Sequence, residues 1–386
     1  MSLSSFAYQL RRRCLTAHAL LATATALLPV SSSCGISSPQ DGGPGSPVWQ
    51  AEGSAYSAPA WADSTVYFGT IDHKVVALDK RTGALRWRTP TGEGGGGSPG
   101  RNVLVVGAIL IVPDSRVYGF DRSTGKLVWY FAPASGDVPG RYTISSDGSR
   151  VFLGSAAGIA YAIDAATGKS LWTNPLAFDG NSVLSYPIID RGCVYLTLRH
   201  FTNPSTGGVV ALDAATGKVV WERDFVATGP GRGAGSYGRV GIWHDLVISA
   251  AEDGTVYGLN RADGTIAWIS PRPSQLQSYD DQRPVVVVGD VAVVGSDLPL
   301  LTGLDAATGR QLWRTAFKSS VDYEIGADAQ SVFVISTNLD ITTVDAASGS
   351  VLWTSSQNDG DFLPFPVTDG QLVYVGGYKK LYAVRR

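Results

Sequence analysis

The stretch ALDAATGKVVW, residues Ala211 to Trp221, decides the fold because six further versions of it occur along the sequence. Each version has a Gly followed, four residues later, by a Trp. The seven Trp residues are roughly 40 to 50 residues apart, which is the period of propeller blades. The other six stretches are ALDKRTGALRW (77–87), GFDRSTGKLVW (119–129), AIDAATGKSLW (162–172), GLNRADGTIAW (258–268), GLDAATGRQLW (303–313) and TVDAASGSVLW (343–353).

The constant spacing inside the repeat predicts a tight turn followed by a strand. A Gly in all seven copies indicates a backbone position with φ above zero, which strains other residues. The Asp carboxylate before it can accept backbone N–H bonds across the turn, and the Thr hydroxyl can do the same. Asn260 replaces Asp in one copy. We expect its amide to keep the acceptor without the charge, so the position has a hydrogen-bonding role.

Each repeat unit predicts four short strands, and no segment shows a sustained helical period. In the first unit the strands are expected at 55–63, 65–70, 74–79 and 84–89. The last unit ends without a fourth strand, whereas Ser46–Glu52 carries a Trp in the matching position. The sequence therefore predicts one all-β domain, 46–386, an eight-bladed propeller closed by its N-terminal strand. The docking Trp residues are Trp49, Trp87, Trp129, Trp172, Trp221, Trp268, Trp313 and Trp353.

The composition favours a folded protein, and the net charge gives no electrostatic reason to expect nucleic-acid binding. Hydrophobic residues make up 44% of the sequence, charged residues 17%, and the formal net charge is −2. Without a basic patch, neither nucleic acid nor an anionic membrane surface is favoured as a partner. Neutral ligands and proteins stay open as partners.

Residues 1–34 have the pattern of an export signal, and 35–45 form a Ser/Pro/Gly-rich linker. Three Arg residues at 11–13 precede the mostly apolar segment 15–30, which is too short for a comfortable membrane span. The signal resembles those of bacterial lipoproteins, with Cys34 as the lipidated residue, although Ser31 departs from the usual aliphatic residue. Ordinary cleavage after small residues is the alternative.

The remaining Cys and His residues predict neither a disulfide nor a metal site. Cys14 falls in the signal, so Cys193 is the one Cys in the body of the protein, in a strand pattern where a buried inert thiol is expected. The four His residues have no metal-ligand spacing.

Residues that could form a binding surface stand where each unit enters its first strand. Tyr and Arg combine contact area with hydrogen bonding, which favours them at interfaces. The alternative is that these side chains line the channel and bond to water. The enlarged turn 198–208 adds Arg199 to the set. The candidates are Arg141, Tyr142, Tyr186, Arg199, Tyr237, Arg239, Arg283, Tyr323 and Glu324.

The motif resembles the tryptophan-docking motif of the eight-bladed propellers of PQQ type, over essentially all of 46–386. That superfamily includes the quinoprotein dehydrogenases. Membership among these enzymes would imply a vicinal disulfide, bound Ca²⁺, an Asp base and long insertions. The sequence has no adjacent Cys pair and is shorter than those enzymes. We expect exposed turn carboxylates at Asp280, Asp281, Asp322, Glu324, Asp359 and Asp361, and no cofactor.

The closer resemblance is to the BamB family of lipoproteins from outer-membrane β-barrel assembly. It shares the export signal, the length and eight compact blades. The resemblance implies a non-enzymatic scaffold in the cell envelope, facing the periplasm or extracytoplasmic space, lipid-anchored and monomeric within a complex that includes a barrel-assembly component. A PQQ-dependent oxidoreductase with calcium, and a propeller that binds a glycan or another ligand, are the alternatives.

Overall fold

The computed structural model describes most of the compact unit Asp41–Arg386. The described residues are 42–92, 100–133, 139–176, 182–200, 206–226, 233–236, 238–271, 284–295, 299–319, 321–336, 340–356, 366–377 and 379–386. They contain strands and turns and no helix. The expected export signal and most of the linker lie outside them. Across this described part, no helix is long and apolar enough to span a membrane.

The strands form eight antiparallel sheets of four strands each, which are the eight blades. Seven sheets take four strands that are consecutive in sequence, numbered from the centre outward. Blades 1 to 4 comprise β2 (Ala60–Ala62), β3 (Thr65–Thr70), β4 (Lys74–Asp79), β5 (Leu85–Pro90); β6 (Leu104–Val106), β7 (Ile109–Pro113), β8 (Val117–Asp121), β9 (Leu127–Phe131); β10 (Pro139–Ser146), β11 (Arg150–Ser155), β12 (Ala160–Asp164), β13 (Ser170–Asn174); and β14 (Ser182–Asp190), β15 (Cys193–His200), β16 (Thr206–Asp213), β17 (Val219–Asp224).

Blades 5 to 7 repeat this order, and blade 8 draws on both ends of the propeller sequence. Their strands are β18 (Gly241–Trp243), β19 (Leu246–Ala250), β20 (Val256–Asn260), β21 (Ile266–Ser270); β22 (Val285–Val288), β23 (Val291–Val294), β24 (Leu300–Asp305), β25 (Gln311–Ala316); β26 (Val321–Ala327), β27 (Ser331–Ser336), β28 (Asp340–Asp345), β29 (Val351–Ser356); and β30 (Val367–Thr368), β31 (Leu372–Gly376), β32 (Lys380–Arg385) with β1 (Pro47–Glu52). The predicted all-β, eight-bladed propeller is confirmed.

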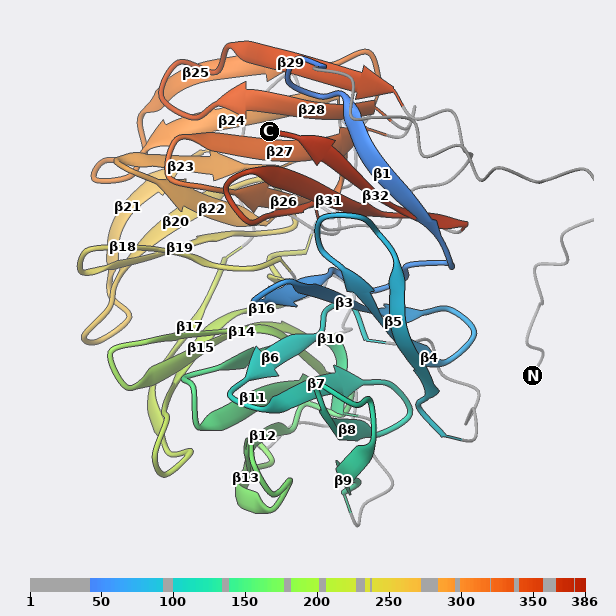
Figure 1. Ribbon diagram of the computed structural model, residues 1–386. Coiled ribbons are helices and arrows are strands. Elements are labelled where there is room, and N and C mark those ends of the chain that lie inside the picture. The colour runs from blue at the N-terminus through green and yellow to red at the C-terminus, as the bar shows by residue number, and fades with distance from the viewer. Residues whose placement is uncertain are drawn as a thin grey trace, which may run out of the picture. The chain divides into compact units, whose positions relative to one another are not determined.

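The N-terminal strand closes blade 8, as predicted. Figure 1 shows β1, in blue, beside β32, in red, and the pairing is antiparallel with Trp49 opposite Ala383. The break between the two ends lies where the other blades have their tight turn, and two backbone bonds replace that turn. Gly45 N donates to Arg385 O at 2.8 Å, and Arg385 N donates to Ser46 O at 2.9 Å. The two end segments therefore rebuild one turn of the repeat.

The repeated Trp joins each blade to the next one. Trp221 Nε1 donates to Arg261 O at 2.8 Å, and the ring lies over Gly264, where an added Cβ would come within 2.6 Å of it. Gly264 has φ +69°, so the absence of a side chain serves both the turn and the close approach. The same indole donation is made by Trp49, Trp87, Trp172, Trp268 and Trp313.

The turn before each Trp, called here the docking turn, is held mainly by its Asp. In blade 4, Asp213 Oδ1 accepts the Thr216 N–H at 2.7 Å and the Thr216 hydroxyl at 2.6 Å. The expectation for Asn260 was wrong. Its amide donates to Thr265 Oγ1, while Asp263 accepts the Thr265 N–H and hydroxyl instead. The negative charge is thus retained in that turn, three residues further along the sequence.

The hydrophobic core is divided among the eight contacts between neighbouring blades. Each cluster of buried side chains combines two adjacent blades; between blades 4 and 5, Tyr195 and Val209 meet Val247 and Tyr257 around Trp221. The other seven contacts have corresponding clusters. Most buried side chains belong to the second and third strands of a blade, such as β3 and β4, whereas the first strands β2 and β6 are half-buried. The first strands can therefore carry residues of other kinds.

Candidate functional site

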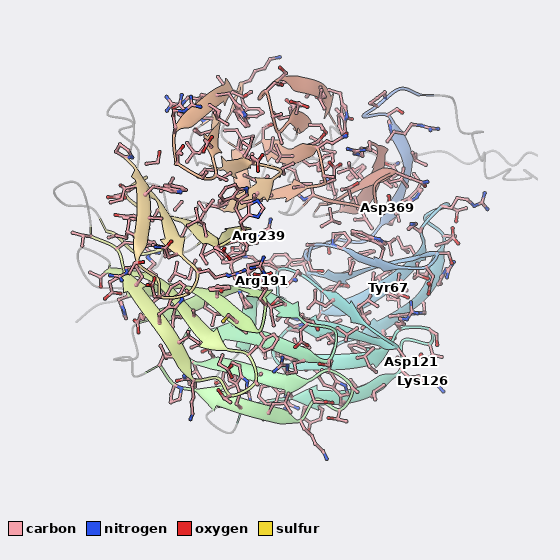
Figure 2. The ribbon with its side chains drawn as sticks, turned by 90° about the vertical axis from the view of Figure 1, so that its left-hand side faces the viewer. Tyr67, Asp121, Lys126, Arg191, Arg239 and Asp369 are labelled. Carbon is pink, nitrogen blue, oxygen red and sulfur yellow. The ribbon has the colours of Figure 1, made fainter. Side chains whose placement is uncertain are left out.

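A cavity of about 400 Å³ lies among the first strands of six blades. Sites for small molecules typically have volumes of roughly 300–1,000 Å³. Figure 2 places Arg239 beside the middle of the ring, where these strands meet. The lining consists of 58–61, 102–105, 143–145, 186–188, Arg239 and Val367.

Most of the cavity wall is apolar, with one aromatic ring exposed. Val105, Ile144 and Ile188 line it from three successive blades. Trp61, on β2, is 38% exposed and stacks on Tyr374 of blade 8 at 6.5 Å between ring centroids. This wall can bury an apolar body of modest size.

Two polar groups in the wall have no partner among the described residues. Arg239 stands just before β18, and no hydrogen bond or ion pair between described groups reaches its guanidinium. The Ser145 hydroxyl, on β10, is buried and unbonded within the same described ranges. By contrast, the Asn102 amide exchanges hydrogen bonds with the backbone of Ile144, both at 2.9 Å, and so joins blades 2 and 3.

Tyr186 is held in the cavity wall by an unusual backbone. It lies in β14 at a register shift between Ser185 and Ile188, with φ +56° and a side chain that is 1% exposed. A left-handed conformation costs a bulky residue about 1–3 kcal/mol, and such strain concentrates at functional sites. Bulges also redirect side chains next to binding sites.

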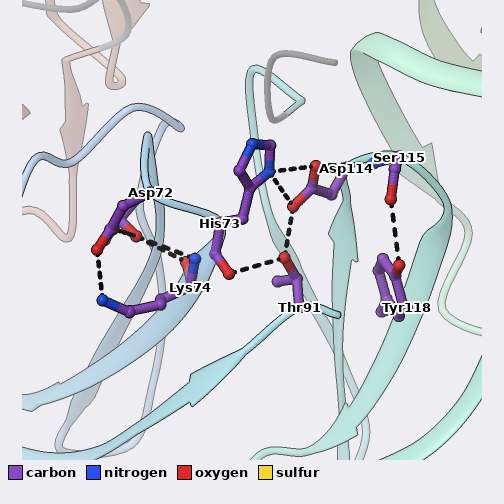
Figure 3. A network of polar contacts seen from close by, with 8 residues as sticks. Asp72, His73, Lys74, Thr91, Asp114, Ser115 and Tyr118 are labelled. Atoms are coloured by element: carbon purple, nitrogen blue, oxygen red, sulfur yellow. Dashed lines mark hydrogen bonds and ion pairs between the residues drawn. The ribbon is translucent and has the colours of Figure 1, made fainter. Parts of the chain in front are cut away.

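A buried carboxylate, that of Asp114, joins the β3–β4 turn of blade 1 to the β7–β8 turn of blade 2 (Figure 3). Asp114, 2% exposed, accepts from His73 Nδ1 at 2.8 and 2.9 Å, from the Thr91 hydroxyl and from Ser115 N–H. His73 belongs to the β3–β4 turn and Asp114 to the β7–β8 turn. The bonds to both oxygens satisfy the carboxylate, so the cluster stabilises the blade contact.

A second cavity, of about 650 Å³, lies between blades 8 and 1 on the side of the docking turns. Lys80 and Asp369 form an ion pair of 2.8 Å there, and Arg81 and Arg385 also line it. Burial alone would raise the pKa of Asp369, but hydrogen bonds from Lys80, the backbone N–H groups and Tyr374 hold it below its usual value. The pair thus reinforces the blade that closes the ring.

The structure separates the predicted binding residues into three groups. Tyr186 and Arg239 share the cavity. Arg199 forms an ion pair with Glu252 of blade 5 and is mostly buried. Arg141, Tyr142, Tyr323 and Glu324 belong to β10 and β26, but their side chains lie outside the description, as do Tyr237 and Arg283 entirely. Sequence reasoning missed Trp61 and Ser145, whose signal was their place in the first strand.

The remaining titratable residues give no metal site in the described part of the protein. There, no group of three or more His, Cys, Asp and Glu residues could hold a metal ion. Cys193 begins β15 and is half-buried, so the expected full burial of its thiol was wrong. Asp322 lies in β26 with its side chain undescribed. The other candidate acids, Asp280, Asp281, Asp359 and Asp361, lie outside the described residues.

Curated relatives include an enzyme and an assembly factor. Tetrathionate hydrolase of Acidithiobacillus ferrooxidans is 25% identical over 82% of this chain and 52% of its own length. Outer membrane protein assembly factor BamB of Yersinia pestis is 24% identical over 67% of this chain and 66% of its own length. The protein thus spans about half of the hydrolase and about two thirds of that BamB.

A solved structure matches much of this chain, and a family model matches the whole propeller region. BamB from Moraxella catarrhalis superposes with a TM-score of 0.58 and 22% identity, covering 78% of this chain and 84% of that one, which shows the fold alone. The family model described as outer membrane protein assembly factor BamB matches residues 40–199, 199–297 and 277–386. These matches include all eight blades. The chain therefore belongs to the family of outer membrane protein assembly factor BamB.

Proposed function

We propose that this propeller is a non-enzymatic scaffold that docks an outer-membrane assembly protein in the cell envelope. The observation that carries the proposal is the family match over 40–386, which spans all eight blades. Exposed side chains at the end of the strands opposite the docking turns supply the contact. The proposal assigns no cofactor to the protein, and one propeller occupies each complex.

Val226 supplies this docking surface with an exposed apolar side chain on a well-fixed backbone. It directly follows Phe225, which is buried and stacks on Tyr257 at 4.2 Å between ring centroids with an interplanar angle of 6°. The Tyr257 hydroxyl donates to Val226 O at 3.1 Å, while the Val226 side chain is 78% exposed. A fixed backbone with an exposed apolar side chain loses little entropy on binding.

Photocrosslinking in intact cells tests this surface. A photoreactive amino acid replaces Val226, and the control replaces Lys126, an exposed residue at the docking-turn end of β9 (Figure 2). We expect the first to yield a covalent product with an outer-membrane assembly protein and the second to yield none. Equal products at both positions, or no assembly protein in either product, would contradict the proposal.

Membrane attachment is a separate part of the proposal and rests on Cys34. We propose that its thiol is lipidated after export and that the linker 35–45 connects the lipid to the propeller. The full-length protein and its Cys34→Ser variant are compared for incorporation of labelled palmitate and for the membrane fraction. If the Cys34→Ser variant takes up no palmitate but associates with membranes as much as the original protein does, the lipid anchor is contradicted. The proposal for the docking surface would not be affected.

A further inference from the structure

We propose that the cavity among the first strands binds an apolar molecule that ends in a carboxylate. The inference rests on the 400 Å³ cavity and its wall, and not on the identity of an assembly partner. An apolar wall with a cationic group favours a ligand that has an apolar body and one anionic end. A polypeptide carboxyl terminus with an apolar last residue and a medium-length fatty acid both have that chemistry.

Arg239 supplies the charge that such a ligand needs. A guanidinium donates to a carboxylate through two parallel N–H groups, and these charge-assisted bonds are stronger than neutral ones. The Arg239 guanidinium has no hydrogen bond or ion pair to any described group, so a carboxylate bound by it breaks no contact with those groups. Arg199, whose side chain is paired with Glu252, illustrates the opposite case.

Ser145 adds a second group that a ligand oxygen would satisfy. Its buried hydroxyl is unbonded among the described residues although it lines the cavity. A buried hydroxyl without a partner costs about 1–3 kcal/mol, so a ligand acceptor that reaches it gains a hydrogen bond. Asn102, in the neighbouring blade, cannot serve without breaking its two bonds to Ile144.

The strained backbone at Tyr186 fixes the shape of the apolar part. Its φ of +56° and the shift in register place the ring in the wall, buried beside Ile188. Trp61, on β2 of blade 1, contributes an exposed ring to the same wall. Aromatic walls of this kind bury apolar groups of ligands. The cavity therefore combines apolar side chains from several blades with two polar groups, the Ser145 hydroxyl of blade 3 and the Arg239 guanidinium of blade 5.

Calorimetric titration of the purified propeller tests the inference with two matched ligand pairs. Octanoate is compared with octanol, and a tripeptide ending in Phe with a free carboxylate is compared with its C-terminal amide. We expect saturable binding of at least one acid, and binding of its uncharged counterpart weaker by about tenfold or more. Octanoate alone indicates a fatty acid, and the peptide acid alone indicates a polypeptide terminus.

Variants assign the binding to the cavity. Arg239→Met should weaken acid binding about tenfold or more, Arg239→Lys should restore part of it, and Ser145→Ala should weaken it less. Arg81→Gln, an exposed cation outside this cavity, should change nothing. Thermal unfolding of each variant shows that the fold is kept. The inference is overturned if neither acid binds saturably, if acid and uncharged counterpart bind alike, or if folded Arg239→Met binds as the original does.

Discussion

The outer strands of the blades repeat one chemistry, whereas the inner strands share none. On the outer strands, the indole N–H of Trp87, Trp172 and Trp313 donates to a backbone carbonyl of the next blade. At the inner strands, Ser145 on β10 and Arg239 just before β18 come from different blades to line one cavity. Every blade offers a backbone carbonyl at the same place, so the same residue, Trp, can donate to it each time. A ligand or partner is met from several sides, and each side needs a different residue.

The largest expected effect tests the outer strands. Trp221 is buried and bonded across the contact between blades 4 and 5. Trp221→Ala should lower the free energy of unfolding by about 3–5 kcal/mol, measured by denaturant or thermal unfolding. Arg239→Met, a change just before the inner strand β18, should leave it nearly unchanged. If both variants lose the same stability, outer and inner strands do not differ in the way described.

A pair of glycines separates the cost of the turn from the cost of the Trp contact. Gly264 and Gly289 both have positive φ, but only at Gly264 would a Cβ meet the Trp221 ring. Gly289→Ala should cost about 1–2 kcal/mol of unfolding free energy for the left-handed backbone. Gly264→Ala should cost more, because the ring must also shift. Equal losses would remove the Trp contact from the explanation of the repeated Gly.

Trp129 offers a natural control for the indole hydrogen bond. Its Nε1 is buried without a partner among the described residues, whereas Trp221 Nε1 bonds to Arg261 O. Trp221→Phe should therefore cost about 1 kcal/mol more than Trp129→Phe, since both lose similar ring area but only one loses a bond. Chemical unfolding of the two variants gives the difference. A larger loss at Trp129 would contradict this account.

The smallest expected effect is the pH dependence of one docking turn. A hydrogen bond from Arg86, aided by bonds from Thr82, lowers the pKa of Asp79 to about 2. Because the folded pKa is below the unfolded one of about 3.9, this stabilisation is present above about pH 4 and lost as pH falls toward about 2. Asp79→Asn should lower the melting temperature slightly at neutral pH, and the difference from the original protein should shrink in acid. A constant difference would contradict the role of the charge.

The sequence predicted the fold well because most blades need the same residues in the same turn and the same outer strand. Seven copies of one turn and strand indicated seven blades, and Trp49 identified the strand that completes the eighth. Asn260 misled because the acceptor moved to Asp263 within the same turn. Such a local exchange keeps the turn while changing which residue forms it.

The candidate site was less predictable because its contacts join different blades. Arg199 and Glu252 are far apart in the sequence, and their ion pair follows from the packing of blade 4 on blade 5. Tyr186 was predicted at a binding surface. Its positive φ and its burial depend on a bulge in β14, which no residue pattern predicted. Trp61 and Ser145 share no motif, so only their common cavity relates them.

The turn rebuilt from Gly45 and Arg385 has a consequence for the order of folding. Seven docking turns close within a few residues, whereas this one joins segments separated by most of the domain. Loop closure costs more entropy as the separation grows, so blade 8 completes late. Until then Trp353, which packs against Gly45, lacks its cover and the strand edges of blade 8 stay open. A polypeptide still emerging from synthesis is thus exposed to aggregation until both of these segments are free to meet.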